Sequence, residues 1–362
     1  MRIMYLTFSF TVGGTERLTV DICNHLSREH DVFLYIINDK IDNQLIETID
    51  NSVIVHCQNR KNKSIFYVFK TMLEIYKYAI ENNIQVIHCN SINCPEMLVL
   101  TKLLRPKTRI IYTIHSVDGF GKMAKSRVLL RNLICTRIIA ISECVKRKII
   151  LQGASKNKTI VIYNGINFNK FLKQKKQFDS NNPVIGCLGR IDPAIKGQDL
   201  LVKATKQLSE TYPRIVCCFG GAVQSKEEMA KITQYIKENH LESNIVFMGN
   251  INNVSKFYSM IDVAVVPSRA EGFGLSFVEA LSLGIPCVSS NVDGLTELNN
   301  ILKQGVMFEK GSVEDLTEKI LLVLMNYEEI KNAMNPNMVL SKFCIESMCE
   351  KLIEIYRDGI LL

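Results

Sequence analysis

The sequence lacks the short motifs by which several kinds of site are normally recognised. Its twelve cysteines include no Cys-x-x-Cys pair, and no Asp-x-Asp motif for a divalent metal occurs. The Gly-x-Gly-x-x-Gly spacing of a dinucleotide-binding loop is also absent. No segment approaches the roughly 20 apolar residues that a transmembrane helix needs. We therefore expect no structural zinc site, no required metal cofactor and no membrane span.

The cysteines are scattered, and we interpret them as free thiols. Cys217 and Cys218 fall in an apolar run, which is typical of core positions. His88, Cys89 and Cys94 lie close together in the sequence. A second pair of ligands is missing, so a structural role is favoured over a metal site. Free cysteines in a chain without a signal peptide indicate a reducing compartment, and we expect a cytoplasmic protein.

The length and composition are those of a globular protein with two domains. The chain has 362 residues, of which 47% are hydrophobic and 22% are charged. Strand-like runs alternate with helical patterns, and no internal repeat or low-complexity tract occurs. This alternation favours an α/β fold with parallel sheets covered by helices on both faces. The polar, lysine-rich residues 167–182 are interpreted as the linker between the domains.

Positive charge is concentrated in the first half of the chain. Residues 1–182 contain 27 Lys and Arg against 14 Asp and Glu, whereas residues 183–362 contain 17 against 22. Residues 102–148 alone hold 12 basic and 2 acidic residues. A basic half joined to an acidic half implies that one half meets an anionic surface or an anionic substrate.

Two basic clusters in the first half lie among apolar residues. They are Lys122, Lys125, Arg127 and Arg131 in one amphipathic segment, and Lys146, Arg147 and Lys148 on the next helix. Such a surface suits anionic lipid headgroups, and two adjacent clusters with few acids favour membrane contact over a merely solvated helix face. We expect no nucleic acid partner, because neither stacking aromatics nor a known binding module accompanies the charges.

Two features at predicted strand ends of the first half are candidate ligand contacts. Gly13 and Gly14 follow the first strand and precede a helix, so their backbone can face an anion; a plain turn is equally consistent. His115 directly follows a strand at residues 109–114. A neutral imidazole there can bond a sugar hydroxyl, and a histidine satisfied at the strand end is the alternative. Asp118 is near enough in sequence to share this site, but no pattern sets its direction.

Two cations follow a strand at residues 184–188 in the second half. Arg190 offers a planar guanidinium and Lys196 a point charge, and both can reach one anion at the carboxyl end of that strand. The pair suits a pyrophosphate, with ordinary surface charge as the alternative. Further along, Gly249 and Asn250 end another strand, where Asn250 can contact the edge of a nucleobase.

The most informative stretch is Glu271-Gly272-Phe273-Gly274-Leu275-Ser276, which is followed by Glu279. It joins a short apolar strand to a helix that Ser276 is expected to cap, with Glu279 in the first turn. Ligands of open α/β sheets bind where strands end and helix N-termini present free N–H groups. The glycines let the backbone approach a ligand, and both carboxylates can accept hydrogen bonds from hydroxyls. Glutamates that lie in water or cap the helix are the alternative.

Taken together, these motifs resemble glycosyltransferase family 4, the retaining enzymes of the GT-B fold, of the type that builds bacterial surface polysaccharides. The most specific match is the pair of glutamates separated by seven residues. The supporting matches, in chain order, are Gly13-Gly14-Thr15-Glu16-Arg17, Ile141-Ser142-Glu143, Asn164-Gly165, Gly189-Arg190 with Lys196-Gly197, and Gly284-Ile285-Pro286. Any one of them can arise by chance, but the ordered set covers nearly the whole chain.

The resemblance implies two Rossmann-like domains that face each other across a cleft, with a C-terminal helix that crosses back to the first domain. On this basis we expect an N-terminal acceptor-side domain at residues 1–166 and 343–362, and a donor-binding domain at residues 183–342. The implied reaction moves a hexose from a nucleotide diphosphate sugar to a glycan or lipid-linked acceptor, with retention at the anomeric carbon. A basic first domain suits such an acceptor at the inner face of the plasma membrane.

The resemblance also assigns roles to individual residues. Arg190 and Lys196 hold the diphosphate, Glu271 accepts hydrogen bonds from the sugar, and Glu279 binds the ribose hydroxyls. The implied catalytic residues are His115, Arg190, Lys196 and Glu271, and the implied substrate-binding residues are Gly13, Gly14, Asn164, Gly272, Phe273, Gly274, Leu275, Ser276, Glu279 and Asn250.

Two departures from the family pattern affect these assignments. The stretch between Arg190 and Lys196 is one residue longer than the commonest spacing, which leaves the reach of Lys196 open. Asp293-Gly294 stands where the family often has Gly-Gly. Because an acid near phosphates is repulsive, Asp293 is expected to face the acceptor or to point away.

Two other functions are compatible with the same residues. A nucleotide-sugar 2-epimerase of the GT-B fold releases free sugar and nucleotide without an acceptor, and a non-catalytic protein only binds a sugar nucleotide or a polyanion. The context of the two glutamates and the segment from Arg190 to Lys196 argue against the epimerase. Intact carboxylates and cations argue against the binding protein, although they also suit binding alone.

Overall fold

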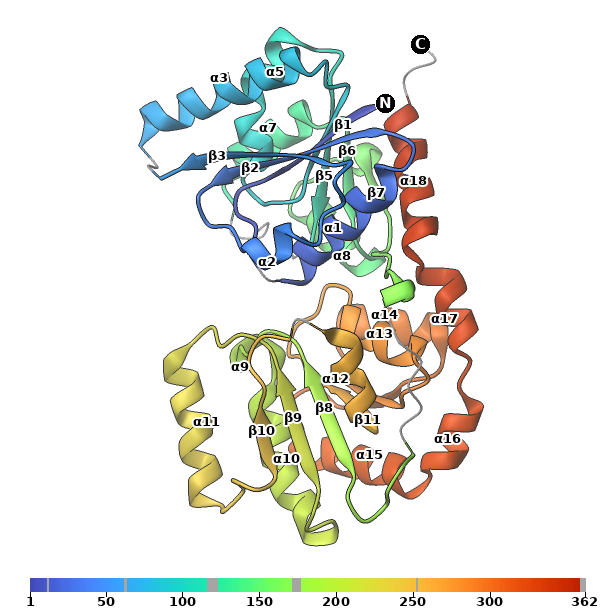
Figure 1. The fold of residues 1–362 in the computed structure, drawn as a ribbon. Helices are drawn as coiled ribbons and strands as arrows, with labels where there is room; N and C mark the ends of the chain where they lie inside the picture. The colour runs from blue at the N-terminus through green and yellow to red at the C-terminus, as the bar shows by residue number, and fades with distance from the viewer. Residues whose placement is uncertain (12, 62–63, 116–122, 171–176, 252, 359–362) are drawn as a thin grey trace. The chain divides into compact units, whose positions relative to one another are not determined.

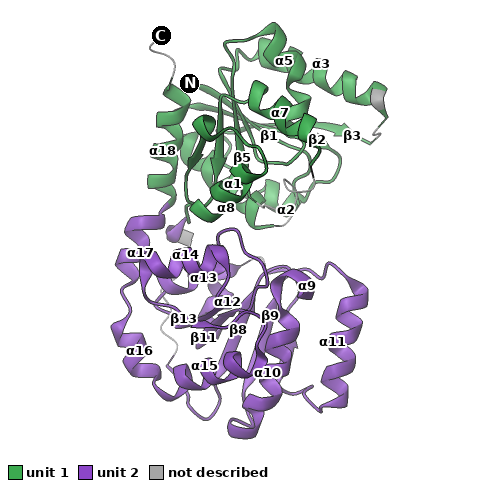
Figure 2. Ribbon diagram, turned by 180° about the vertical axis from the view of Figure 1, so that it is seen from behind, with its two compact units in different colours: residues 1–166, 345–362 green, residues 167–344 purple. Residues whose placement is uncertain are grey.

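The structure is a computed structural model that describes residues 1–11, 13–61, 64–115, 123–170, 177–251 and 253–358. The chain forms two compact units, coloured separately in Figure 2. The first unit combines Met1–Ile166 with Ile345–Leu362, and the second is Asn167–Cys344. Each unit is built on its own parallel β-sheet (Figure 1).

The sheet of the first unit has seven strands in the order β3-β2-β1-β4-β5-β6-β7, and all of its pairs are parallel. Its strands are β1 Arg2–Thr7, β2 Asp31–Asn38, β3 Ile54–Arg60, β4 Val86–Cys89, β5 Arg109–Ile114, β6 Arg137–Ala140 and β7 Thr159–Val161. The central strands are almost fully buried because helices cover both faces of the sheet, which explains their continuous apolar sequences.

The helices of the first unit include those that carry the predicted basic clusters. They are α1 Gly14–Leu26, α2 Asn43–Ile46, α3 Ile65–Glu81, α4 Cys94–Met97, α5 Val99–Leu104, α7 Lys125–Ile134, α8 Glu143–Leu151 and the C-terminal α18 Ile345–Arg357. Within the described residues, no helix combines the length and the apolarity that crossing a bilayer requires.

The C-terminal helix α18 returns to the first unit, as the resemblance implies. It packs against α1, and the hydroxyl of its buried Tyr356 bonds the Tyr5 hydroxyl on β1 at 2.7 Å. The same hydroxyl contacts Nδ1 of His88 on β4, whose Nε2 lies 2.6 Å from Oγ1 of Thr113 on β5. Both ring nitrogens of His88 therefore have partners, which agrees with a structural role for this histidine. Burial lowers the pKa of His88 to about 3.

The sheet of the second unit has six parallel strands in the order β10-β9-β8-β11-β12-β13. Its strands are β8 Val184–Leu188, β9 Val216–Gly220, β10 Ile245–Phe247, β11 Val263–Val266, β12 Cys287–Ser290 and β13 Val306–Phe308. Its helices are α9 Pro193–Lys196, α10 Gln198–Thr211, α11 Lys226–Glu238, α12 Val254–Met260, α13 Leu275–Ser282, α14 Asp293–Leu302, α15 Val313–Met325, α16 Tyr327–Ala333 and α17 Pro336–Phe343.

The cysteines agree with the interpretation from sequence. Ten of the twelve are buried, only Cys57 and Cys344 are partly exposed, and all are free. Cys217 and Cys218 lie on β9 inside the second unit, and Cys217 Sγ accepts a hydrogen bond from Thr205 Oγ1 at 3.0 Å. Burial raises the pKa of the Cys217 thiol to about 12, so it stays protonated.

Arg131 does not belong to a basic surface, and this corrects the prediction from the sequence. Its side chain is fully buried, and its guanidinium bonds the Glu96 carboxylate, the Tyr112 hydroxyl and the Ile92 carbonyl. Arg127 also bonds Glu96, although its side chain is 44% exposed. Burying a guanidinium requires such partners, because an unpaired buried charge is strongly unfavourable. Glu96 therefore removes one cation completely, and a second in part, from the predicted lipid-facing cluster.

The predicted start of one helix also changes. Helix α13 begins at Leu275 with Gly274 as its N-cap, so Ser276 lies inside the first turn instead of capping it. The C-terminal helix α18 spans Ile345–Arg357, and the extended Cys344 separates it from α17. Phe343 packs edge-on against Phe273 in the second unit, whereas the Ile345 N–H bonds the Ile166 carbonyl in the first. Phe343 thus packs within the second unit and Ile345 bonds within the first, on either side of Cys344.

Candidate functional site

The predicted donor-binding residues of the second unit lie at the point where the strand order of its sheet reverses. Strands β8 and β11 are hydrogen-bonded neighbours, although β9 and β10 lie between them in the sequence. The loop after β8 leads to Lys196, and the loop after β11 contains Glu271. Crevices at such reversal points are where open α/β sheets bind ligands. The topology therefore brings together two segments that the sequence analysis singled out separately.

An ion pair joins Lys196 and Glu271 at this point. The Lys196 ammonium lies 2.6 Å from Oε2 of Glu271, and the Ser268 hydroxyl donates to the same oxygen at 3.2 Å. The two charged side chains are 27% and 14% exposed, so the pair is shielded from solvent but still reachable. Charge-assisted bonds of this length are among the stronger polar interactions in proteins. The extra residue before Lys196 thus does not keep it from Glu271.

The short helix α9, which ends at Lys196, is fastened to the loop that carries Glu271. Arg269 forms two bonds to the Asp199 carboxylate, at 2.6 and 2.8 Å, and a third to the Pro193 carbonyl at 2.6 Å. The Arg269 N–H also donates to the Ile195 carbonyl at 2.8 Å. The Asp199 bonds raise the pKa of Arg269. These bonds set the position from which Lys196 reaches Glu271, and the sequence analysis missed both Arg269 and Asp199.

Gly197 permits the close approach of these two segments. Its φ of 67° lies in the left-handed region, where side chains are disfavoured. A Cβ atom at this position would collide with the carbonyl oxygen of Pro267. Glycine is therefore required directly after Lys196 for the chain to turn against the end of β11.

Arg190 is placed differently from Lys196. Its guanidinium lies 3.6 Å from the Asp192 carboxylate, and its side chain is about half exposed at 51%. Its backbone carbonyl is held by the buried Gln198 side chain at 2.9 Å. The described contacts thus join Lys196 to Glu271 but place Arg190 beside Asp192, with its backbone anchored and its side chain accessible.

The glycine loop after Glu271 is packed against the start of α14. The Gly294 N–H donates to the Glu271 carbonyl at 3.2 Å, and a Cβ on Gly294 would lie 2.7 Å from the same oxygen. Gly274 has a φ of 103°, and a Cβ there would lie 2.5 Å from Leu295 Cδ2. Asp293 is the first residue of α14, where its negative charge is favoured by the helix dipole. This placement gives a structural reason for an acid beside the loop.

Glu279 is held by a residue that the sequence analysis did not name. The hydroxyl of Tyr258 on α12 is 2.9 Å from Oε2 of Glu279 and 3.1 Å from the Ser276 carbonyl. Tyr258 is buried, and burial, reinforced by the nearby Glu279 carboxylate, raises the pKa of the phenol well above its usual value. The phenol therefore remains a hydrogen-bond donor.

The remaining predicted residues of the donor-binding loops differ in how exposed they are. Phe273 is buried, whereas Gly272, Leu275 and Ser276 are partly exposed. Asn250 is exposed after β10, at the same carboxyl edge of the sheet, and the Gly249 carbonyl accepts a bond from the Gly221 N–H at 2.7 Å. The residues predicted for the donor in the second unit thus lie at the carboxyl edge of its sheet or in the first turns of α13.

The first unit has its own group of predicted residues. Gly13 is the N-cap of α1, at the end of the connection from β1, and its carbonyl accepts the Arg17 N–H at 3.1 Å. Gly14 begins the helix. His115 follows β5, and its Nε2 is enclosed without a hydrogen-bond partner among the described residues. Burial lowers the pKa of His115 to about 4, so the imidazole is neutral at physiological pH.

Asn164 shares this feature with His115. It is buried, and its Oδ1 has no hydrogen-bond partner within the part of the chain that the structure describes. A buried polar atom without a partner is unfavourable unless a ligand or water satisfies it. Asp118 lies outside the described residues. Within those residues, no three or more His, Cys, Asp or Glu side chains gather as they would around a metal ion.

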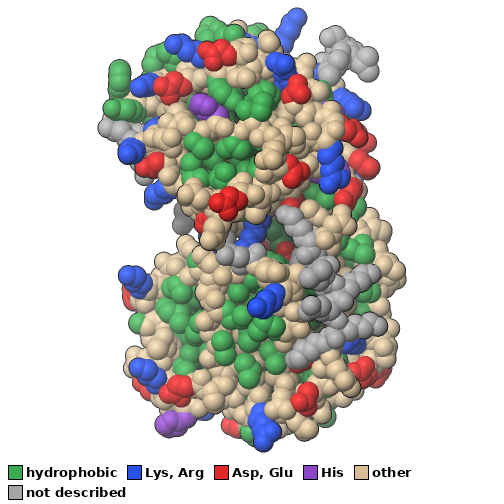
Figure 3. Space-filling view, in the orientation of Figure 1, with side chains coloured by type: hydrophobic (Ala, Val, Ile, Leu, Met, Phe, Trp, Pro, Cys, Tyr) green, Lys and Arg blue, Asp and Glu red, His purple; other side chains and the backbone are tan. Residues whose placement is uncertain are grey.

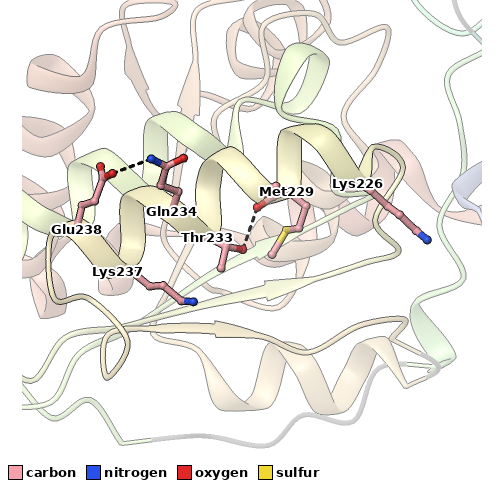
Figure 4. Close-up of a pocket in the computed structure, with 7 residues that line it drawn as sticks. Lys226, Met229, Thr233, Gln234, Lys237 and Glu238 are labelled. Atoms are coloured by element: carbon pink, nitrogen blue, oxygen red, sulfur yellow. Dashed lines mark hydrogen bonds between the residues drawn. The ribbon is translucent and has the colours of Figure 1, made fainter.

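A shallow groove elsewhere in the second unit is not part of this site. It follows α11 and is lined by Lys226, Met229, Ala230, Thr233, Gln234, Lys237 and Glu238 (Figure 4). Gln234 donates to Glu238 at 2.8 Å and Thr233 donates to the Met229 carbonyl at 2.9 Å, so these polar groups are satisfied within the helix. None of the predicted site residues lines the groove.

Comparison with known proteins covers both units. Residues 168–338 match the family model described as Glycosyl transferases group 1, and residues 12–170 match Glycosyltransferase Family 4. The O-antigen biosynthesis glycosyltransferase WclY of Escherichia coli is 26% identical over 317 residues, which cover 82% of each protein. The UDP-Gal:alpha-D-GlcNAc-diphosphoundecaprenol alpha-1,3-galactosyltransferase of Escherichia coli is 22% identical over 326 residues, or 83% of this chain and 82% of that protein.

A solved structure shows the same fold. The crystal structure of Anabaena Alr3699/HepE in complex with UDP and glucose matches with a TM-score of 0.84 at 21% identity, and the match covers 99% of this chain and 100% of that one.

Replacing Gly197 with alanine tests the close approach at the site. We expect Gly197→Ala to lower the free energy of unfolding by more than about 3 kcal/mol, because it adds backbone strain and a collision with the Pro267 carbonyl. Gly311→Ala is the matched control, since Gly311 has a φ of 84° with open space around it and should lose only about 1 kcal/mol. Equal losses in urea-induced unfolding of the two variants would contradict this account of Gly197.

Proposed function

Because this chain belongs to glycosyltransferase family 4 and has the GT-B fold, we propose that it transfers a hexose from a nucleotide diphosphate sugar to a hydroxyl acceptor, with retention at the anomeric carbon. The observation that carries the proposal is the bond between Lys196 and Glu271 at the reversal point of the second sheet. A cation suited to phosphate and an acid suited to sugar hydroxyls are thereby adjacent, as the two parts of such a donor require.

Lys196 and Arg190 are assigned to the leaving group. Departure of the diphosphate leaves negative charge on a phosphate oxygen, and fixed cations that face this oxygen lower the barrier. Lys196 is held in place by the fastened α9, whereas the accessible Arg190 can turn from Asp192 to the phosphate. The N–H groups that begin α13 supply further donors. By analogy with oxyanion donors, each such group contributes about 3–4 kcal/mol to the barrier.

Binding of the donor exchanges partners within the ion pair. The diphosphate replaces Glu271 as the partner of Lys196, and sugar hydroxyls then donate to Glu271. Neither charge is left unpaired, so the exchange avoids the cost of a shielded lone charge. Glu271 is not assigned as a nucleophile, because in this proposal its carboxylate accepts hydrogen bonds from sugar hydroxyls.

Retention is assigned to attack on the face from which the diphosphate leaves. The acceptor oxygen forms the new bond to the anomeric carbon as the bond to phosphate breaks, and the acceptor proton passes to the leaving phosphate. His115 contributes a neutral imidazole that bonds a donor hydroxyl. With a pKa of about 4 it is not charged at neutral pH and is a poor general acid.

UDP-sugars are the first donors to test. The Anabaena relative is bound to UDP and glucose, and the Escherichia coli relative is named for UDP-Gal. In our proposal the paired cations supply the electrostatic stabilisation that a divalent metal gives other enzymes, so transfer requires no metal.

Transfer should depend on both members of the ion pair. We expect Lys196→Ala and Glu271→Ala each to lower the transfer rate at least a hundredfold, because each removes a group that contacts the donor. Lys203→Ala is the matched control, since Lys203 is exposed on the neighbouring α10. The measurement is formation of glycosylated acceptor and of nucleoside diphosphate, with thermal unfolding as a check of folding.

The same assay separates the other two functions. Release of free sugar and nucleotide from donor alone, unchanged by acceptor, would indicate an epimerase. Donor binding without turnover across an acceptor panel would indicate a binding protein. Transfer that survives both substitutions at the wild-type rate would refute the assignment of Lys196 and Glu271.

We further propose that the acceptor is a lipid-linked glycan and that the first unit touches an anionic membrane surface. The first unit contains 25 Lys and Arg against 17 Asp and Glu, and the second contains 19 of each, so the whole net charge of +8 belongs to the first. The Escherichia coli galactosyltransferase is named for a diphosphoundecaprenol substrate, which supports such an acceptor.

Apolar side chains are exposed on the same unit. Leu103 and Leu104 on α5 and Leu129 and Leu133 on α7 are between 55% and 73% exposed, and both helices pack against α4. Hydrophobic side chains reach the surface of this unit among Lys and Arg side chains (Figure 3). Exposed leucines beside lysines are typical of surfaces that insert shallowly into headgroups. In the proposal, these leucines contribute to membrane contact in place of the buried Arg131.

Vesicle sedimentation tests the membrane surface. We expect binding to vesicles with anionic phosphatidylglycerol, its loss at high salt, and severalfold weaker binding by the double variant Leu129→Ser/Leu133→Ser. The double variant Leu322→Ser/Met325→Ser on α15 is the control, because these side chains are also exposed, at 45% and 75%, but lie on the second unit. Absence of salt-sensitive binding by the wild type would rule out this surface.

A further inference from the structure

Tyr258 on α12 contacts one of the predicted donor-binding residues without being one itself. We propose that Tyr258 is a positioning residue that aims the Glu279 carboxylate at the ribose of the bound nucleotide, and thereby sets the preference for ribose over deoxyribose. This inference rests on the proposed function, in which Glu279 binds the ribose hydroxyls.

The geometry places the Tyr258 hydroxyl against both the side chain and the backbone of α13. It lies 2.9 Å from Oε2 of Glu279 and 3.1 Å from the carbonyl of Ser276, one turn earlier in the same helix. Its single hydrogen is therefore shared between these two oxygens. Tyr258 is almost completely buried at 3% exposure, so its ring cannot swing away without opening the packing of α12.

This contact restricts the plane of the Glu279 carboxylate. Glu279 is partly exposed on α13, and the terminal torsion of a glutamate is broad. Once Oε2 is bonded to a buried phenol, the direction of Oε1 is set as well. A carboxylate fixed before the ligand arrives loses less freedom on binding, which strengthens its bond to a ribose hydroxyl.

The proposed contact also survives changes of pH. Burial raises the pKa of Tyr258 well above its usual value, so the phenol stays protonated and remains a donor to Glu279 at neutral pH. In this proposal the carboxylate accepts hydrogen bonds from the two hydroxyls of a ribose, and a nucleotide without the 2′-hydroxyl forfeits one of these bonds.

Tyr258→Phe isolates the hydroxyl, because the ring and its packing are kept. The probes are UDP, ADP and GDP, each compared with its 2′-deoxy counterpart by calorimetry, and the nucleotide that binds most tightly is used. We expect Tyr258→Phe to weaken the ribonucleotide about fivefold while leaving the deoxynucleotide nearly unchanged, so that their affinity ratio falls. Tyr235→Phe on α11 is the matched control and should change neither affinity.

The outcomes separate this inference from the function on which it rests. If Glu279→Gln removes the ribose preference and Tyr258→Phe leaves it intact, the positioning role is wrong and the ribose assignment stands. If Tyr258→Phe weakens both nucleotides equally, its role is the structural one of bonding Ser276, and the inference also fails. If the wild type shows no ribose preference with any probe, or Glu279→Gln does not change it, the ribose assignment fails together with the inference.

Discussion

The site depends on the bond between Lys196 and Glu271. Each side chain is largely shielded from solvent, so each charge needs the other while no ligand is bound. A nucleotide sugar suits this pair because it brings a partner for each member, phosphate for the cation and hydroxyls for the acid. In our proposal the two halves of the donor are therefore recognised together. A ligand with only a phosphate or only a sugar supplies a new partner for only one of the two side chains.

The parallel sheet and a few backbone contacts make this bond possible. The reversal of strand order makes β8 and β11 neighbours, and ligand-facing loops follow both. Gly197 lets α9 turn tightly beside Pro267, and Arg269 joins that turn to Asp199. On the other side, Gly294 lets α14 abut the Glu271 carbonyl. The functional side chains are few, but their positions are set by residues that do not contact ligand.

The sequence predicted the elements and the family because both are encoded locally. Apolar runs marked the strands, and the motifs around Glu271 indicated the family that the comparisons confirm. Contacts between residues that are distant in the sequence could not be predicted from these local patterns. Arg131 is buried by Glu96, 35 positions away; Arg269 bonds Asp199 at 70 positions and Tyr258 bonds Glu279 at 21. Ser276 was expected to cap α13, but the left-handed turn at Gly274 and its packing on Leu295 start the helix earlier.

A crystal structure with the tightest-binding UDP-sugar, chosen by thermal shift, tests the central claim most directly. Our account predicts that the bond between Lys196 and Glu271 is replaced, with the ammonium within hydrogen-bond distance of a diphosphate oxygen and the carboxylate accepting from sugar hydroxyls. A structure in which the donor binds elsewhere while Lys196 and Glu271 remain bonded to each other would contradict it.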